Sequence, residues 1–139
     1  MQKLHLFIAR SGKPEPDIRK VLDSFGDHTV IVWQYVENDY DLINETIKLA
    51  PWYGIIYDNE CVDEAFARSL PEFMAMADEH EVLGVFRKID DEKCSRSPRF
   101  YKKHVKLQTN SLMPANGELI LPMLNGWLME YDTSGIYQK

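Results

Sequence analysis

The first 88 residues alternate between short apolar runs and segments with helix-type spacing, and this rhythm constrains the fold more than any other feature. The apolar, β-prone runs span residues 4–9, 29–33, 53–57 and 82–86. A segment with apolar residues at helical spacing stands between each pair of runs. The order β-α-β-α-β-α-β predicts an α/β fold with a mostly parallel sheet, flanking helices and right-handed crossovers.

The expected helices carry recognisable start and stop signals. Asp17 opens the first, and Gly26 is placed to end it. Either Asp39 or Asp41 caps the second, and Pro51 stops it. A third helical stretch starts at residue 63 or 64 and runs to residue 70. Pro71 is expected to begin a further helix that reaches about residue 80.

After residue 87 the rhythm changes. Residues 90–98 form a polar, charge-rich segment that reads as a loop and as a candidate for mobility. Residues 99–107 mix basic and apolar side chains and predict one or two short strands. Residues 119–124 and 126–132 are short apolar pieces. With 139 residues and no internal repeat, the chain is expected to form a single domain with an irregular C-terminal region of small strands.

Charge is distributed unevenly along the chain. The net charge is −6, but residues 87–106 hold eight Lys or Arg against three Asp or Glu. An acidic protein is a poor general binder of nucleic acid, whereas a basic segment can hold a phosphorylated ligand or form a solvated surface. No apolar run is long enough to cross a membrane, and no signal peptide is recognisable. Cys61 and Cys94 are expected to be free thiols in the cytoplasm.

Polar side chains follow three of the expected strands, at residues 10–11, 35–39 and 58–60. The carboxyl ends of parallel strands are where ligands bind in open α/β sheets. Asp58 and Glu60 are alternate residues, so in an extended segment both carboxylates point to one side. They are therefore candidates to share one Mg²⁺ or Mn²⁺. The alternative is that Asp58 caps the next helix while Glu60 is solvated.

The layout resembles the nucleotide-sugar-binding half of GT-A glycosyltransferases. Residues 57–60, Tyr-Asp-Asn-Glu, resemble the acidic DXD element of that family, with glutamate in place of its second aspartate. Residues 98–105 and 125–127 are similar to the acceptor side of small, phage-type members. The resemblance implies a nucleotide-binding-like half over residues 1–88 and an acceptor-side or accessory segment over residues 89–139.

The resemblance also implies a reaction: transfer of a sugar from a nucleoside diphosphate sugar to a hydroxyl acceptor, with a metal at Asp58 and Glu60. The positions implied to contact the donor are Ala9, Arg10, Ser11, Glu37, Asn38, Asp39, Arg99 and Lys102. Nucleic acid is allowed as the acceptor but is not indicated. Some members of such families have lost activity, so whether this chain is an enzyme stays open.

Two residues are candidates for proton transfer. His104 lies in the basic segment, and an imidazole can accept or donate a proton in neutral solution, although a surface role is the alternative. Asp132 ends a strand-like run and is a candidate base for an acceptor hydroxyl, or else a turn residue. A different class of function is also open: a small non-enzymatic α/β protein, such as a phage-type inhibitor or assembly factor, that acts by contact with another protein.

Overall fold

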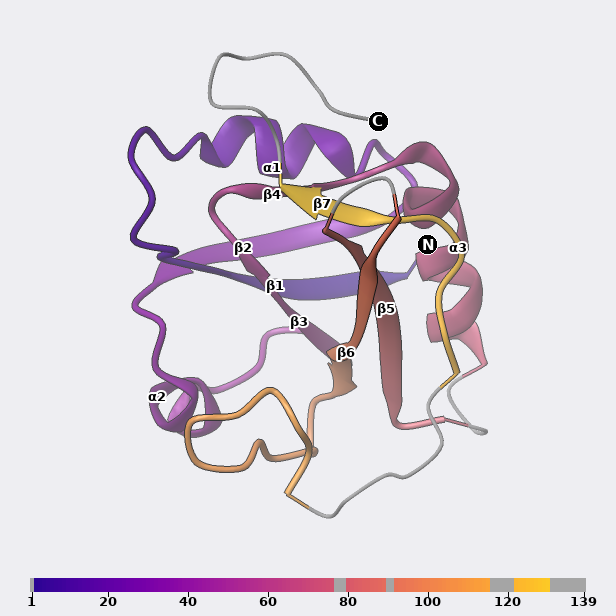
Figure 1. Cartoon of the computed structure of the whole chain (residues 1–139). Helices are drawn as coiled ribbons and strands as arrows, with labels where there is room; N and C mark the ends of the chain where they lie inside the picture. The colour runs from indigo at the N-terminus through magenta and orange to yellow at the C-terminus, as the bar shows by residue number, and fades with distance from the viewer. Residues whose placement is uncertain (1, 77–79, 90–91, 116–121, 131–139) are drawn as a thin grey trace.

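The computed structural model describes residues 2–76, 80–89, 92–115 and 122–130, which form one curved sheet and three helices (Figure 1). The strands are β1 (Lys3–Ala9), β2 (Val30–Val36), β3 (Trp52–Tyr57), β4 (Glu60–Val62), β5 (Val82–Lys88), β6 (Cys94–Lys102) and β7 (Leu128–Glu130). The helices are α1 (Ile18–Ser24), α2 (Tyr40–Glu45) and α3 (Glu64–Ala75). None of the described helices has the length and apolar character needed to cross a bilayer.

The sheet is mixed, which corrects the predicted mostly parallel arrangement. Its strand order is β2-β1-β3-β6-β5-β7-β4. The predicted parallel relation holds for β1, which lies between β2 and β3 and runs parallel to both. It fails beyond β3, because β6 is inserted between β3 and β5 and runs antiparallel to each. Residues 94–98 were expected to form a loop because they are polar and carry no alternating pattern. In the structure they form the first half of β6, a central strand.

A bulge in β6 gives Arg99 its position. Gly84 and Leu83 are consecutive in β5, yet they pair with Pro98 and Phe100, so Arg99 is the extra residue of β6. Bulges of this kind bend a strand and re-aim a side chain. Pro98, which has no N–H, lies outside the part of β6 that pairs with β3. The bulge therefore turns a basic side chain into the interior.

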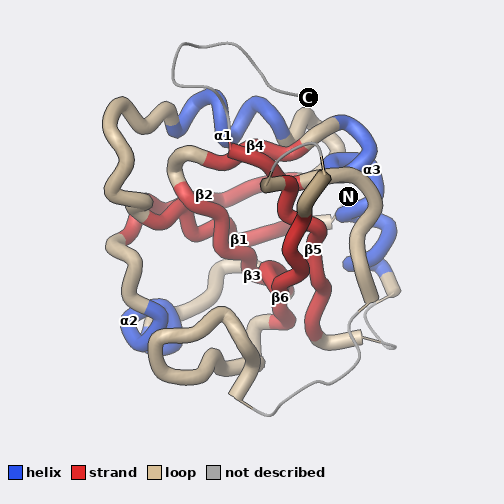
Figure 2. The backbone as a smooth tube through the Cα atoms, in the orientation of Figure 1, coloured by secondary structure: helices blue, strands red, loops and turns tan. Residues whose placement is uncertain are grey.

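The connection between β3 and β4 requires the sheet to curl. Only Asp58 and Asn59 separate the two strands in the chain, but the strands occupy the third and the last places in the sheet. The sheet closes into a half-barrel that brings β4 back to the end of β3. Figure 2 shows the strands at the centre and the helices around the outside.

Each face of the sheet has its own core. On one face α1 and α3 pack against β1 through apolar side chains that include Val21, Phe66 and Leu6. On the other face Ile43 of α2 packs against Phe7 and Tyr53. Burial of these side chains from both faces explains why β1 and β3 are almost continuously apolar.

The predicted caps are confirmed for all three helices, with one change at Pro71. Asp17, Asp39 and Asp63 each accept a hydrogen bond from the backbone N–H three residues later. Gly26 follows α1 with a φ of 62°, as a helix-ending glycine does. Pro71 does not start a new helix; it lies inside α3, which continues to Ala75.

Candidate functional site

Asp58 lies where the carboxyl ends of β1, β2 and β3 meet. Its Oδ1 accepts a hydrogen bond from the Ser11 backbone N–H at 3.1 Å. Its Oδ2 accepts one from the Tyr35 hydroxyl at 2.6 Å. The Asp58 N–H donates to the Ala9 carbonyl at 2.9 Å. Residues that the sequence placed after three separate strands are thus joined through one buried carboxylate.

Arg10 and Glu37 form an exposed ion pair beside Asp58. Arg10 Nε lies 2.7 Å from Glu37 Oε1, with 53% and 71% of the two side chains exposed. The Arg10 guanidinium stacks over the Tyr35 ring, 4.5 Å from its centroid. The hydrogen bond from Tyr35 to Asp58 raises the pKa of the tyrosine, so its hydroxyl keeps its proton. This edge presents a cation, an aromatic face and a carboxylate together to solvent.

Asn38 and Asp39 differ in what they do at this edge. Asp39 caps α2 by accepting the Leu42 N–H at 3.1 Å, one of the alternatives that the sequence left open. Asn38 is exposed between Asp39 and Glu37. Of the residues predicted to bind the sugar donor, Ala9, Arg10, Ser11 and Glu37 are therefore grouped with Asp58. The contact of Asp39 is structural, because its carboxylate caps α2.

Glu60 is engaged by cations of the protein itself. Its side chain is 2% exposed and receives both Nη atoms of Arg99, at 2.8 and 3.1 Å, and Nε of Arg87 at 2.7 Å. The Tyr57 N–H adds a fourth hydrogen bond at 2.8 Å. Burial raises the pKa of the Glu60 carboxyl, but the Arg99 charge and these hydrogen bonds outweigh it, so the pKa lies below its usual value.

These contacts bear on the predicted metal site. Asp58 and Glu60 take their hydrogen bonds from different donors, and two guanidinium groups occupy the oxygens of Glu60. A divalent cation at Glu60 would face two positive charges, so the donor set does not fit a shared ion. Within the described residues, no three His, Cys, Asp or Glu side chains group as a metal site would need. The shared Mg²⁺ or Mn²⁺ stays a prediction from sequence alone.

Arg99 lies inside the half-barrel and not at the edge that carries Arg10. Besides Glu60, its Nη1 donates to the Ile55 carbonyl at 3.1 Å, and its guanidinium lies 5.2 Å from the Tyr57 ring centroid. The Tyr57 hydroxyl is hydrogen-bonded to that of Tyr40. Arg87 was not predicted as a partner of Glu60, although its place in the basic segment was a signal.

Lys102 and His104 lie toward the opposite end of the strands, near the amino end of β3. Lys102 pairs with Trp52, the first residue of β3, so about 17 Å of strand separates it from the Asp58 end. His104 Nε2 lies 3.0 Å from Glu81 Oε1 on the exposed surface. The predicted proton carrier His104 is thus not placed beside Asp58. Asp132, the other predicted catalytic residue, falls outside the described residues.

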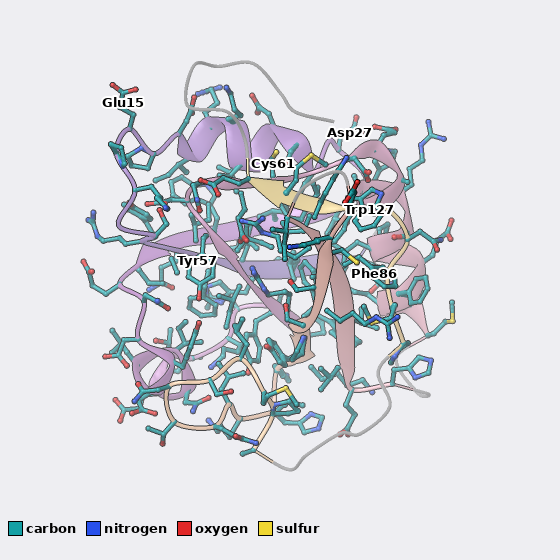
Figure 3. All side chains as sticks on the ribbon, viewed as in Figure 1. Glu15, Asp27, Tyr57, Cys61, Phe86 and Trp127 are labelled. Atoms are coloured by element: carbon teal, nitrogen blue, oxygen red, sulfur yellow. The ribbon has the colours of Figure 1, made fainter. Side chains whose placement is uncertain are left out.

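A cavity of about 760 Å³ lies apart from this edge, between α1 and the strands β4 and β7. Trp127 lines it, as do Val62, Met129, Lys20 and Lys88. The Trp127 ring lies against Phe86, with centroids 5.9 Å apart; Figure 3 shows both residues on the β5 side of the molecule. The cavity is large enough for a small ligand, but its walls mix acidic and basic side chains and favour no single chemistry.

The chain was compared with known proteins. No model of a protein family matches it, and no curated protein matches it significantly. The functional interpretation of the candidate site therefore depends on its geometry alone.

Proposed function

We propose that this chain is a glycosyltransferase-like protein that binds a nucleoside diphosphate sugar at the carboxyl ends of β1, β2 and β3. The observation that carries the proposal is the junction of Asp58 with Ser11 and Tyr35 at this edge. We also propose that it acts in the cytoplasm, where cysteines such as Cys61 and Cys94 stay reduced.

The topology supports this position for a ligand. The chain runs from β1 outward to β2 and then returns past β1 to β3, so the strand order reverses between β1 and β3. Ligands of open α/β sheets bind in the crevice that such a reversal opens beyond the carboxyl ends. Asp58 bridges this reversal, because it bonds to Ala9 and Ser11 from the end of β3.

The side chains at the edge suit the parts of a nucleotide. Arg10 can exchange its exposed partner Glu37 for a phosphate at little cost, because exposed ion pairs contribute little. Glu37 follows the second strand, where a carboxylate binds ribose hydroxyls in other nucleotide-binding α/β folds. Sugar transfer to a hydroxyl acceptor is the reaction that the resemblance implies, and Mg²⁺ or Mn²⁺ is included in the test because that family uses one.

The test measures thermal stability and heat of binding with a panel of nucleoside diphosphates and their sugars, each with Mn²⁺, with Mg²⁺ or with EDTA. We expect one nucleotide to raise the melting temperature. Arg10→Gln and Glu37→Gln should each weaken its binding about tenfold, which is the loss of about 1.4 kcal/mol. Release of the free nucleoside diphosphate, followed over time, reports transfer or hydrolysis.

Lys102→Gln is the matched control, because it removes a charge from the opposite end of the strands and should bind as the wild type does. The proposal is overturned if no nucleotide changes the melting temperature, or if Lys102→Gln weakens binding as much as Arg10→Gln does. Suppose instead that nucleotide binding requires the metal, and that Glu60→Gln abolishes this requirement without loss of stability. That result would support the predicted metal site shared by Asp58 and Glu60.

A second candidate function is action by contact with another protein. It is favoured by exposed apolar side chains in and beside the outer strand β2, of which Trp33 is 46% exposed and Leu49 is 58% exposed. A stoichiometric protein partner together with no response to any nucleotide would favour this function over nucleotide binding.

A further inference from the structure

The strand β2 is an outer edge of the sheet and, within the described residues, pairs only with β1. Its seven residues, Val-Ile-Val-Trp-Gln-Tyr-Val, include no charge, no proline and no glycine. Natural edge strands are commonly short, charged, bulged or covered, because an open edge invites pairing with another strand. The opposite edge, β4, follows that rule with three residues, whereas β2 has none of these protections.

The direction of the β2 backbone groups follows from two hydrogen bonds. The Val30 N–H donates to the Gln2 carbonyl, and the Arg10 N–H donates to the Val36 carbonyl. At both ends of β2, the backbone groups of the even-numbered residues are therefore directed at β1. Backbone groups of a strand alternate in direction along the chain. The odd-numbered residues Ile31, Trp33 and Tyr35 therefore direct their N–H and C=O groups outward, at the spacing that an added extended strand would match.

Apolar side chains extend the edge on both faces of the sheet. Trp33 pairs with Leu6 and so projects on the face that carries α1, where it is 46% exposed. Leu49 lies on the other face, because its N–H donates to His5, whose ring bonds to Gln34 of β2. Val30, the first residue of β2, is also 44% exposed. A strand added to β2 would cover apolar surface above and below the hydrogen-bonded ladder.

We propose that β2 pairs with β2 of a second copy of this chain, antiparallel and about a twofold axis at Trp33. In that register Trp33 lies opposite its own copy and Ile31 lies opposite Tyr35, so all three outward residues find partners. An antiparallel pair exchanges two hydrogen bonds at each such position. The two sheets would join into one continuous sheet.

The open edge of β2 is the reason for choosing a second copy, because the partner must supply an uncharged, open strand and β2 of a second copy is one. The protein carries a net charge of −6, so two copies repel each other over most of their surfaces. Within β2, however, a second copy places no like charges opposite each other, because the strand has none. The twofold arrangement is self-complementary, as the common dimeric interfaces of soluble proteins are.

The test uses sedimentation velocity over a range of protein concentrations. We expect the wild type to pass from monomer to dimer, and Trp33→Lys to stay monomeric because two lysines would lie opposite each other. Trp33→Glu should also stay monomeric. An equimolar mixture of Trp33→Lys and Trp33→Glu should dimerise again, because the register brings the two opposite charges together. Ile89→Lys, which adds a charge at another exposed apolar residue, should dimerise as the wild type does.

Hydrogen exchange supplies a readout at the backbone. The amides of Ile31, Trp33 and Tyr35 should exchange more slowly as protein concentration rises, while that of Val32, directed at β1, should be unaffected. A wild type that is monomeric at millimolar concentration overturns the proposal, and so does a Trp33→Lys variant that dimerises as the wild type does. A mixture of the two charge variants that stays monomeric overturns the register at Trp33.

Discussion

Glu60 and Arg99 are 39 residues apart in the chain and form a buried two-point ion pair, with N to O distances of 2.8 and 3.1 Å. Only 1% of Glu60 and 5% of Arg99 is exposed. Arg87 approaches the same carboxylate at 2.7 Å from the neighbouring strand β5. The pair joins β4 to the bulge of β6, and so it ties the last strand of the half-barrel to the middle of the sheet.

Glu60→Gln should lower the free energy of unfolding by about 3–5 kcal/mol, because it leaves a buried guanidinium without its counter-charge. Urea denaturation measures this loss. Glu64→Gln is the matched control, since its ion pair with Arg68 is exposed and should be worth less than about 1 kcal/mol. Equal losses in the two variants would contradict the structural role of Glu60.

His5 should make stability depend on pH near neutrality. Burial lowers the pKa of its imidazole below 6.5, Lys48 lowers it further, and a hydrogen bond with Gln34 opposes them. The unfolded chain therefore takes up this proton at a higher pH than the folded chain does. The free energy of unfolding should fall as pH drops from about 6.5 through the folded pKa, and then change no further through this group.

His5→Gln should flatten the pH dependence of urea denaturation between pH 7 and pH 5. His104→Gln removes an exposed imidazole instead and should keep the part of the slope that His5 supplies. A His5→Gln variant with an unchanged slope would show that another group is responsible.

Gly126→Ala should destabilise the protein more than Gly12→Ala. Both glycines have positive φ, 78° and 82°, so alanine costs about 1 kcal/mol or more at either position. At Gly126, however, the added Cβ would lie 2.3 Å from Asp63 Oδ1 and 2.4 Å from the Phe66 nitrogen, whereas at Gly12 nothing lies within 4 Å. We expect an additional loss of about 1–3 kcal/mol for Gly126→Ala in thermal denaturation.

Thr29→Val should leave stability unchanged or raise it by about 1 kcal/mol. Among the described residues, the Thr29 hydroxyl is the buried side-chain oxygen that lacks a hydrogen-bond partner, and valine replaces it at nearly the same shape. Thr46→Val is the contrast, because its hydroxyl donates to the Leu42 carbonyl at 2.8 Å. A drop in melting temperature for Thr29→Val larger than for Thr46→Val would contradict this assignment.

Local signals in the sequence identified much of the first half of the fold. The apolar runs of β1, β2 and β3 were predicted, and the caps at Asp17, Asp39 and Asp63 were found because a cap depends on contacts three residues away. The grouping of Arg10 with Glu37 followed from parallel strands ending at one edge. These features need only short-range interactions or a simple rule of sheet topology.

The rest was decided by the tertiary structure. Insertion of β6 between β3 and β5 depends on pairings between distant segments, which the irregular pattern of residues 94–102 does not reveal. The roles of Asp58 and Glu60 depend on the curl of the sheet, which sends one carboxylate to Ser11 and Tyr35 and the other to two arginines. The sequence by itself determined that these carboxylates follow a buried strand; only the folded sheet decided which donors surround each of them.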